Sequence, residues 1–459
     1  MHYVSTRGAA PELGFADTLL AGLASDGGLY VPADWPALDV PVDAGTYAEV
    51  AVAVMWPFVE GDVEREAFET MVADAYATFD HPDVVPLTEL GDGLWLAELF
   101  HGPTLAFKDV AMQLVGRLFD HELARRGERI TIIGATSGDT GSAAIEALRD
   151  REAIDVVILH PEGRVSEVQR RLMTTVDSPN IRNVSIEGTF DDCQDLVKAM
   201  FAHEEFRAAQ RLSAVNSINF ARVMAQTVYY VTSHRLLGGG PVSFAVPTGN
   251  FGNVFAGYGA MRMGVPIRQL VVGSNRNDIL TRFFATGTME IQGVEATISP
   301  AMDIQVSSNL ERLLFELNGR DGVALADLMQ QFRAEGTVTF PTDLLDRLSE
   351  TFSGARFDDE ETAATIAEVL DRHGVLLDPH TAIGVAAARS ARVDPSVPMV
   401  VLGTADPAKF PDAVEAATGR HPMLPERLAD LFDRPERLDH LPNDLAAVEG
   451  YVAEFTARH

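Results

Sequence analysis

The pattern that most constrains the fold is an alternation of short Val- and Ile-rich runs with longer helical periods. "RITIIGAT", "DVVILH", "VSFAVPTG" and "VPMVVLGTA" are typical of buried strands, and "DVAMQLVGRLFDHELARRG", "GSAAIEALRD" and "GNVFAGYGAMRMG" of helices. This alternation predicts an α/β class with parallel sheets. A chain of 459 residues is also too long for one core, so two or three domains are expected.

The patterns suggest where these domains begin and end. Residues 1–90 mix helical periods with turn signals and predict an N-terminal subdomain. Residues 91–128 and 226–459 are assigned to a large α/β domain, and residues 129–225 to a smaller one. Within the large domain, about 305–370 is acidic and predicts an added helical region, and the tail "MLPERLADLFDRPERLDHLPNDLAAVEGYVAEF" is also predicted to be helical.

Charge and cysteine content limit the possible partners. The formal net charge is −31 and the sequence pI about 4.6, a field that repels nucleic acid and anionic membranes. An anionic substrate would therefore need a local cationic pocket. No apolar run approaches the roughly 18 residues of a membrane span, and the first residues resemble neither a signal nor a transit peptide, so cytoplasmic residence is expected. Cys193, the single cysteine, excludes an intrachain disulfide or a Cys-ligated cluster and is interpreted as a small buried side chain; no metal is expected.

Lysine is scarce. Only Lys108, Lys198 and Lys409 occur among 36 basic residues, so surface cations are mostly arginine. A retained lysine is a candidate for what arginine cannot do, which is to lose a proton and attack a carbonyl. Lys198 lies in an amphipathic helical pattern, "CQDLVKAMF", which favours a solvated face. Lys108, beside Phe107 in "HGPTLAFKD", is the candidate nucleophile, since partial desolvation would favour its free amine.

A glycine-rich turn follows one predicted strand. In "VPTGNFGNVFAG", the strand leads into Gly249, Asn250, Phe251, Gly252 and Asn253, and a helix begins at once. Glycines let the backbone approach a ligand, and amides at a helix start bind anions, phosphate above all. The spacing matches neither known phosphate-loop motif. The alternative is an Asn/Gly-rich turn with no ligand.

Two further strand ends carry polar residues. "IIGATSGDTGSAA" places Thr136, Ser137, Asp139 and Thr140 between a strand and an Ala-rich helix, a pattern that suits a carboxylate or another oxyanion. The alternative, N-capping, accounts for one or two of these residues only. In "VVLGTADPAKF", Thr404 ends an apolar strand. Because ligands bind at the carboxyl ends of parallel strands, these loops are candidates for one crevice.

The combination indicates a phosphorylated carbonyl cofactor. A lysine would carry the aldehyde, the glycine-rich turn would hold the phosphate, and the ring would act as an electron sink. Pyridoxal 5'-phosphate fits these requirements.

Six motifs also resemble the threonine synthase family, pyridoxal-phosphate enzymes of the tryptophan synthase β-subunit fold type (fold type II). "YVSTRG", "DGGLYVP", "FHGPTLAFKD", "TSGDTG", "GNFGN" and "TADPAKF" occur in the family's order, from residue 3 to residue 410. The extended N-terminal part and the helical addition resemble the longer subgroup. The resemblance implies two parallel-sheet α/β domains with an N-terminal subdomain.

The resemblance also implies residue roles. Lys108 would carry the cofactor, Gly249–Asn253 would hold its phosphate, and Thr404 would face the pyridine nitrogen. The Thr136–Thr140 stretch would line the substrate carboxylate and the cofactor's phenolic oxygen, the latter through Asp139, where shorter relatives have Asn. "VNSINFAR" resembles the family's "NS.N...R" stretch, so that Asn216, Ser217 and Arg222 become candidates for the substrate phosphate; the alternative for Arg222 is a surface cation. Asp406, where the family often has His, receives no role.

The implied activity is that of a carbon–oxygen lyase acting on phosphates. It converts O-phospho-L-homoserine and water to L-threonine and phosphate, the last step of threonine biosynthesis. A dehydratase or cysteine synthase of the same fold type is the runner-up. A non-catalytic metabolite-binding protein that has kept the cofactor loops is a third possibility. A monomer or homodimer is expected, with no nucleic acid or membrane partner.

Overall fold

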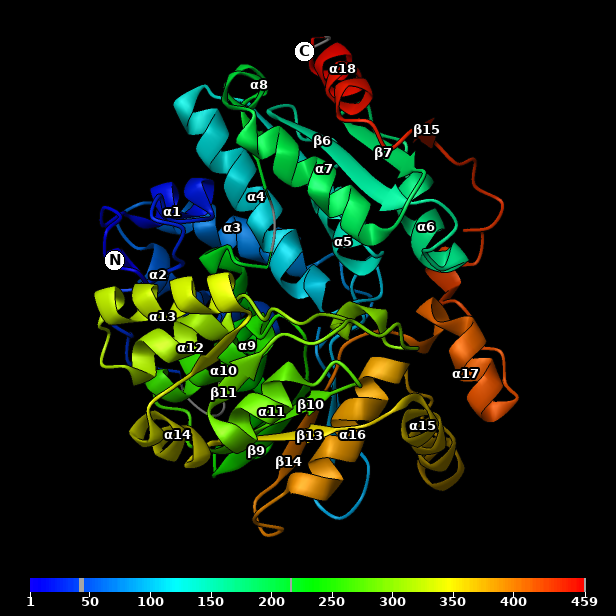
Figure 1. Ribbon diagram of the computed structural model, residues 1–459. Helices are drawn as coiled ribbons and strands as arrows, with labels where there is room; N and C mark the ends of the chain where they lie inside the picture. The colour runs from blue at the N-terminus through cyan, green and yellow to red at the C-terminus, as the bar shows by residue number, and fades with distance from the viewer. Residues whose placement is uncertain (41–44, 215–216, 458–459) are drawn as a thin grey trace. The chain divides into compact units, whose positions relative to one another are not determined.

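A computed structural model describes residues 1–40, 45–214 and 217–457 of the chain (Figure 1). Two compact units form. Unit 1 comprises Met1–Ala111 and Ser217–Pro422, and unit 2 comprises Met112–Asn216 and Met423–His459. Each unit contains a parallel sheet with helices, which confirms the predicted α/β class. Among the described residues, no helix is both long enough and apolar enough to cross a bilayer.

The main sheet of unit 1 has six strands in the order β13-β10-β9-β14-β4-β3. All neighbours pair parallel except β3 with β4. β10 pairs with β9 between Leu270 and Phe244, and β14 pairs with β4 between Val401 and Leu96. The carboxyl ends of β4, β9, β10 and β14 therefore share one edge. The strand bounds are β3 Leu87–Glu89, β4 Leu94–Glu98, β9 Val242–Pro247, β10 Ile267–Ser274, β13 Phe352–Arg356 and β14 Met399–Gly403.

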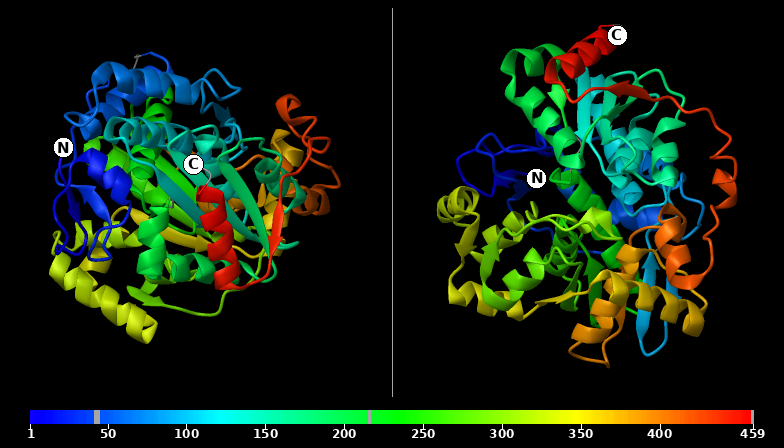
Figure 2. Two further views of the ribbon diagram at one scale, coloured as in Figure 1. Left: turned by 90° about the horizontal axis from the view of Figure 1, so that it is seen from above. Right: turned by 45° about the vertical axis from the view of Figure 1, so that its right-hand side comes forward.

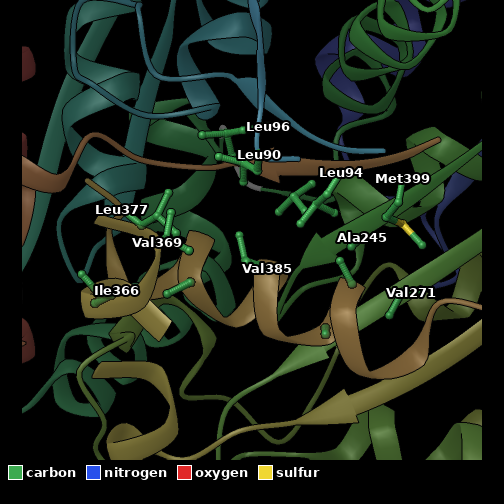
Figure 3. Packing of buried hydrophobic residues seen from close by; sticks show 14 residues of the cluster. Leu90, Leu94, Leu96, Ala245, Val271, Ile366, Val369, Leu377, Val385 and Met399 are labelled. Atoms are coloured by element: carbon green, nitrogen blue, oxygen red, sulfur yellow. The ribbon is translucent and has the colours of Figure 1, made fainter. Parts of the chain in front are cut away.

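Helices α15 (Asp359–His373) and α16 (Pro379–Ala391) cover one face of this sheet. Figure 3 shows their apolar side chains meeting those of the strands. Val385 of α16 and Val369 of α15 lie in one buried cluster with Leu96, Ala245 and Val401 from three strands. α9 (Phe220–Leu236) and α10 (Gly252–Met263) also pack on this sheet, where Tyr230 of α9 makes an edge contact with Phe244 of β9 at 4.6 Å between centroids. Such burial is the main source of stability for this layer.

The N-terminal segment is part of unit 1. β1 (Tyr3–Ser5) and β2 (Tyr30–Pro32) pair antiparallel, and α1 (Phe15–Ala21), α2 (Tyr47–Val59) and α3 (Arg65–Tyr76) follow. The remaining elements of unit 1 are α11 Ile279–Thr286, β11 Thr288–Glu290, η1 Pro300–Met302, α12 Leu310–Leu317, α13 Gly322–Glu335, β12 Thr337–Thr339, α14 Thr342–Ser349, η2 Pro407–Lys409 and α17 Pro411–Thr418. The span 305–370, predicted as an added helical region, contains α12, α13, α14 and part of α15, and also the strands β12 and β13, of which β13 belongs to the main sheet.

Unit 2 is built on a parallel sheet of order β15-β7-β6-β5-β8. Cys193, Leu196 and Met200 of α7 pack with Val448 and Val452 of α18 against β5, β6 and β7. The long helix α4 (Lys108–Arg126) begins in unit 1 and continues into unit 2. The other elements of unit 2 are β5 Ile130–Ala135, α5 Asp139–Leu148, β6 Ile154–Pro161, α6 Glu167–Thr174, β7 Ile181–Ile186, α7 Phe190–Ala202, α8 Glu204–Gln210, β8 Leu212–Ser213, η3 Glu426–Leu428, β15 Asp439–Leu441 and α18 Leu445–Thr456.

The tail differs from its prediction in two respects. It was assigned to the large domain and to helix, but residues from 423 onward group with unit 2, and only η3 and α18 are helical. β15 pairs parallel with β7, with Asp439 opposite Val184, and extends the edge of that sheet (Figure 2). Three residues of an edge strand carry too short an apolar pattern to be recognised in sequence.

The domain bounds predicted near residues 128 and 225 also differ from the boundaries after Ala111 and Asn216.

Candidate active site

Three of the predicted segments follow neighbouring strands of unit 1. Lys108 lies after β4, Thr404 directly after β14, and the Gly loop (Gly249–Asn253) after β9. β14 lies between β4 and β9 and pairs parallel with both. The three segments therefore leave the same edge of one sheet, as expected for a ligand site of an α/β protein.

The lysine loop (Gly102–Lys108) is held against the segment after β14. Phe107 N–H donates to the Thr404 carbonyl at 2.9 Å, and Asp406 N–H donates to the Leu105 carbonyl at 3.1 Å. Leu105, which is buried, has a left-handed backbone with φ of 61°. A strained residue of this kind persists only where its surroundings impose it. Lys108 starts α4 with its side chain 8% exposed and its Nζ 5.1 Å from the centre of the Phe107 ring.

A buried polar network fixes the lysine loop from inside. Asp109 accepts hydrogen bonds from the Thr104 backbone N–H at 2.8 Å and from the Thr104 hydroxyl at 2.7 Å. The Lys409 ammonium donates to the Thr104 carbonyl at 2.7 Å and is fully buried. Burial raises the pKa of Asp109 to about 6, although these Thr104 bonds and the Lys409 charge oppose the shift. The residue after Lys108 therefore anchors the loop instead of facing a ligand.

Thr404 presents a hydroxyl that no described residue uses. Its backbone N–H donates to the Thr381 hydroxyl at 3.0 Å, and Thr381 in turn donates to Asp378. Thr404 is 6% exposed, and its Oγ1 has no hydrogen-bond partner among the described residues. Since buried hydroxyls are normally paired, this atom is available to a ligand.

In the Gly loop, the chain itself binds two backbone carbonyls and leaves several backbone amides for a ligand. The Gly249 carbonyl accepts from the Ser307 hydroxyl at 2.6 Å, and the Asn250 carbonyl accepts from Asn309. The Asn250, Gly252 and Asn253 amides donate to no acceptor in the part of the chain that the structure describes. Phe251 has φ of 63° and begins α10 from a left-handed conformation. The loop is thus a helix N-terminus with several unused donors, an arrangement that binds anions.

Asn253 adds a side-chain donor to the same helix start. Its Oδ1 accepts from the Tyr229 hydroxyl at 2.5 Å and from the Tyr230 hydroxyl at 3.1 Å, which fixes the orientation of the amide group. Its Nδ2 is buried and has no partner among the described residues. Fixed in this way, Nδ2 can only serve as a donor to a group other than the residues that the structure describes.

These atoms fit pyridoxal phosphate. The orphaned Thr404 hydroxyl suits a ring nitrogen, and the Gly loop amides with Asn253 Nδ2 suit a phosphate. Lys108, the covalent anchor in this interpretation, belongs to the same unit as both.

A second cationic feature lies near the start of α9. Arg222 is 4% exposed, so its alternative interpretation as a surface cation is wrong. Its Nε and Nη1 are buried and have no partner among the described residues, and burial lowers the pKa of the guanidinium to about 10. The Ser217 carbonyl accepts from Asn309 Nδ2 at 3.2 Å. Asn216, predicted together with these two residues, lies outside the described residues.

The Thr loop (Thr136–Gly141) follows β5 and opens α5 in unit 2. Thr136 Oγ1 accepts from the backbone amides of Gly138 at 3.0 Å and Gly141 at 2.9 Å. Asp139 Oδ1 accepts from Gln169 Nε2 at 2.9 Å. Ser137 and Thr140 are half-buried. The predicted oxyanion loop is therefore a compact, partly self-bonded turn.

Three other residues from the sequence analysis have surroundings that point to no part in the site, namely Cys193, Lys198 and Asp406. Cys193 is buried, as expected, and burial raises the pKa of its thiol to about 12. Lys198 is exposed and pairs with Asp195 at 2.9 Å, which confirms its interpretation as a solvated face. Asp406 caps η2 by accepting from Ala408 N–H at 2.8 Å, and burial raises its pKa to about 6.

Comparison with known proteins decides the family. A model described as "Threonine synthase N terminus" matches residues 2–76, "Pyridoxal-phosphate dependent enzyme" matches residues 83–404, and "Threonine synthase, C-terminal" matches residues 381–452. The chain belongs to the threonine synthase family. It is 54% identical to a threonine synthase of Pseudomonas aeruginosa, with 100% of this chain and 99% of the relative covered.

Solved threonine synthases have the same fold. The structure of pyridoxal-phosphate-bound threonine synthase from Brucella melitensis matches with a TM-score of 0.97 and 54% identity over 99% of each chain. The yeast threonine synthase structure matches with a TM-score of 0.94 and 38% identity over 100% of this chain and 99% of that chain. Fold type II and the use of pyridoxal phosphate, inferred above from motifs, are thereby confirmed.

Sequence reasoning missed the residues that hold the site in place. Lys409 is one of only three lysines, and this rarity could have marked it as a residue with a special task. The structure places it in the core, whereas the surface cations of this chain are mostly arginines. Ser307 and Asn309 carried no signal, since they lie 58 and 59 residues from their partners in the Gly loop.

Proposed function

We propose that this chain converts O-phospho-L-homoserine and water to L-threonine and phosphate, in the cytoplasm, with pyridoxal phosphate bound at Lys108. The observation that carries the proposal is Arg222, a buried guanidinium with two nitrogen atoms that have no partner among the described residues. A buried charge without a partner is costly, so the position favours an anionic ligand. Phosphate matches the planar fork of arginine, which binds it through two parallel hydrogen bonds.

The two anion sites have different tasks in this proposal. The Gly loop amides and Asn253 Nδ2 hold the phosphate of the cofactor, which stays bound between turnovers. Arg222, with Asn216 and Ser217, holds the phosphate of the substrate, which must leave. The chain carries a net charge of −31, which disfavours an anionic ligand. Charges that are more than about 10 Å away are largely screened, so the donors of each site can attract a phosphate at short range.

Lys108 is proposed to move the protons. When bound, the pyridoxal ring supplies an electron sink for charge that develops at the substrate's Cα. The Lys108 amine takes the proton from Cα and moves one from Cβ as phosphate leaves from Cγ. Cγ then gains a proton, the hydroxyl of water adds at Cβ, and a proton returns to Cα. Phe107 beside the amine limits its contact with water.

The Thr404 hydroxyl is proposed to orient the ring through its nitrogen. A neutral hydroxyl does not supply a proton there as a carboxylic acid would, so the electron sink is weaker. The positions of Lys108 and the substrate phosphate then matter more to the rate. In unit 2, the Thr loop is proposed to line the substrate carboxylate through Thr136, Ser137 and Thr140, with Asp139 at the phenolic oxygen.

The decisive assay offers purified holoenzyme O-phospho-L-homoserine and, separately, L-threonine. We expect equimolar release of phosphate and threonine from the first and no 2-oxobutanoate from the second. Formation of 2-oxobutanoate from threonine without phosphate release would favour a dehydratase. A colourless protein that remains colourless with added pyridoxal phosphate would favour a non-catalytic binding protein.

A matched pair of variants tests the role of Arg222. Arg222→Met removes the fork and should raise KM for O-phospho-L-homoserine by roughly a hundredfold, while the cofactor absorbance is kept. Arg235→Met, near the end of the same helix α9, is the control and should leave KM unchanged. An unchanged KM in Arg222→Met would remove Arg222 from the substrate site.

A further inference from the structure

Asn309 connects the two stretches that are proposed to bind phosphate. It precedes α12 and is fully buried. Its Nδ2 donates to the Asn250 carbonyl at 3.0 Å and to the Ser217 carbonyl at 3.2 Å. Its backbone N–H donates to the Asn250 carbonyl as well, at 3.1 Å. One side-chain amide thus bridges the Gly loop and the start of the stretch that leads to Arg222.

The bonds to the Gly loop control where its amides point. A peptide unit is planar and trans, so fixing a carbonyl turns the next N–H the opposite way. Ser307 holds the Gly249 carbonyl and thereby directs the Asn250 amide. The peptide between Asn250 and Phe251 is held at both ends, by Asn309 at its carbonyl and by Thr248 Oγ1, which accepts from Phe251 N–H at 3.2 Å. This double anchor imposes the left-handed Phe251 and so starts α10.

Asn309 also limits the size of the residue at the helix start. A Cβ built on Gly252 would lie 3.3 Å from Asn309 Nδ2. The glycine therefore lets the amide group of Asn309 pack directly against the loop. Gly252, the second glycine of the motif "GNFGN", therefore makes room for Asn309 as well as for a ligand.

Arg312 fixes the orientation of Asn309. Its Nη1 donates to Asn309 Oδ1, its Nε donates to the Tyr30 carbonyl at 3.0 Å, and its Nη2 donates to the Ile218 carbonyl. Because Oδ1 accepts from a guanidinium, Nδ2 must be the atom that faces the two carbonyls. Arg312 is fully buried, and burial lowers the pKa of its guanidinium to about 9, which still leaves it charged at neutral pH.

The N-terminal motif "YVSTRG" holds the same turn of α12. Glu311 accepts from the Thr6 hydroxyl at 2.7 Å and from Arg7 Nε and Nη2 at 3.0 and 2.8 Å. The Thr6 hydroxyl also accepts from Leu29 N–H at 2.8 Å, which ties in the second motif, "DGGLYVP". These motifs, which the reaction itself does not use, therefore anchor the start of α12.

We propose that Asn309, oriented by Arg312, is a positioning residue that keeps the cofactor-phosphate loop and the substrate-phosphate stretch in register. The inference rests on the proposed function, since it takes the Gly loop and Arg222 as the two phosphate sites. Asn309 touches neither ligand in this arrangement. It acts through the carbonyls of Asn250 and Ser217, so its loss should weaken both sites together, whereas loss of Ser307 should weaken the cofactor site alone.

The test compares three variants of the holoenzyme. Asn309→Asp keeps the size and the partner of Arg312 but replaces the bridging donor with an acceptor. Ser307→Ala removes only the bond to the Gly249 carbonyl. Asn318→Asp, the same substitution at the C-cap of α12, is the control.

Two quantities are measured. The cofactor dissociation constant comes from the loss of visible absorbance when holoenzyme is diluted into buffer without cofactor, and KM is measured with saturating pyridoxal phosphate. Asn309→Asp should raise both by roughly tenfold or more, because small misplacements of binding groups have effects of this size. Ser307→Ala should raise the dissociation constant and leave KM within about twofold, and Asn318→Asp should change neither.

Two outcomes would overturn the inference. One is a lowered melting temperature of Asn309→Asp with both constants unchanged, which means that Asn309 is structural only. The other is a change in one constant alone, which means that Asn309 does not couple the sites. If Asn309→Asp does not fold, Asn309→Ser is measured with the same expectations, since serine suits a helix start. Failure of the proposed function would instead appear in wild-type enzyme, as no release of phosphate.

Discussion

The Gly loop of unit 1 and the Thr loop of unit 2 are built on the same plan, a parallel strand followed by a glycine-containing turn and a helix, yet they differ in what is left to bind a ligand. In the Gly loop, Ser307 and Asn309 hold the carbonyls from outside, and the amides of Asn250, Gly252 and Asn253 keep no partner among the described residues. In the Thr loop, Thr136 uses its own hydroxyl to bind the Gly138 and Gly141 amides.

In the proposed function, this difference separates the site of the resident cofactor from the site of the passing substrate. The Gly loop has fixed donors with no internal use, which is what a tightly held cofactor phosphate requires. The Thr loop has satisfied much of its own backbone, so its contribution to a ligand must come from Ser137, Thr140 and the remaining amides. Sequence patterns predicted a phosphate site for the Gly loop and an oxyanion site for the Thr loop, but they did not show that Thr136 would bind the amides of its own loop.

The largest expected effect comes from reversing a donor in the Gly loop. Asn253→Asp keeps Oδ1 for the two tyrosines but places a carboxylate oxygen where Nδ2 faces the proposed phosphate. Like charges at short range cost several kcal/mol, so the cofactor dissociation constant should rise roughly a hundredfold. Absorbance titration with pyridoxal phosphate measures it, with Asn318→Asp as control. A change below about twofold would mean that the Gly loop is not the phosphate site.

Unlike the Gly loop and the Thr loop, the lysine loop is held by two buried ionisable side chains, Asp109 and Lys409. Burial raises the pKa of Asp109 to about 6, above its ordinary value of 3.8. The stability that Asp109 contributes is therefore full below about pH 4 and is lost as pH rises through 6. The difference amounts to roughly 3 kcal/mol at neutral pH.

Asp109→Asn does not titrate and should gain stability relative to the wild type by about that amount between pH 4 and pH 7. Urea unfolding midpoints of the two proteins across this range measure the change. A slope of opposite sign would show that attraction to Lys409 outweighs the cost of burying the carboxylate.

The internal bonds of the Thr loop can be removed with little change in shape. Thr136→Val leaves the Gly138 and Gly141 amides without their acceptor and should lower the free energy of unfolding by about 2 kcal/mol. KM should rise while cofactor affinity stays constant, because the Gly loop is untouched. Thr136→Ser keeps the hydroxyl and should restore both quantities. A loss of cofactor affinity equal to the rise in KM would contradict the division of labour between the loops.

The smallest effect is expected at Asp139 of the Thr loop. Asp139→Asn keeps the Oδ1 that accepts from Gln169 and should change kcat/KM by no more than about 1 kcal/mol in activation free energy. Steady-state kinetics with O-phospho-L-homoserine measure this. A loss of several hundredfold would show that the carboxylate charge itself acts in the reaction.

Local patterns were sufficient for the parts of the site that lie at strand ends. Lys108, the Gly loop and Thr404 were found because strand periodicity, glycine and the rarity of lysine all mark them within a few residues. Ser307 and Asn309 could not be found in this way, because each acts on a carbonyl more than fifty residues away. β15 was missed for a similar reason: its partner β7 is distant in sequence, and three residues carry too little pattern.

The central claim is that the cofactor is bonded to Lys108, and the chain offers only two other lysines. Borohydride reduction of the holoenzyme, followed by proteolysis and mass spectrometry, identifies the bonded residue directly. The account predicts one pyridoxyl-phosphate label, on the peptide that contains Lys108. A label on Lys198 or Lys409, or no label at all on a coloured protein, would contradict it.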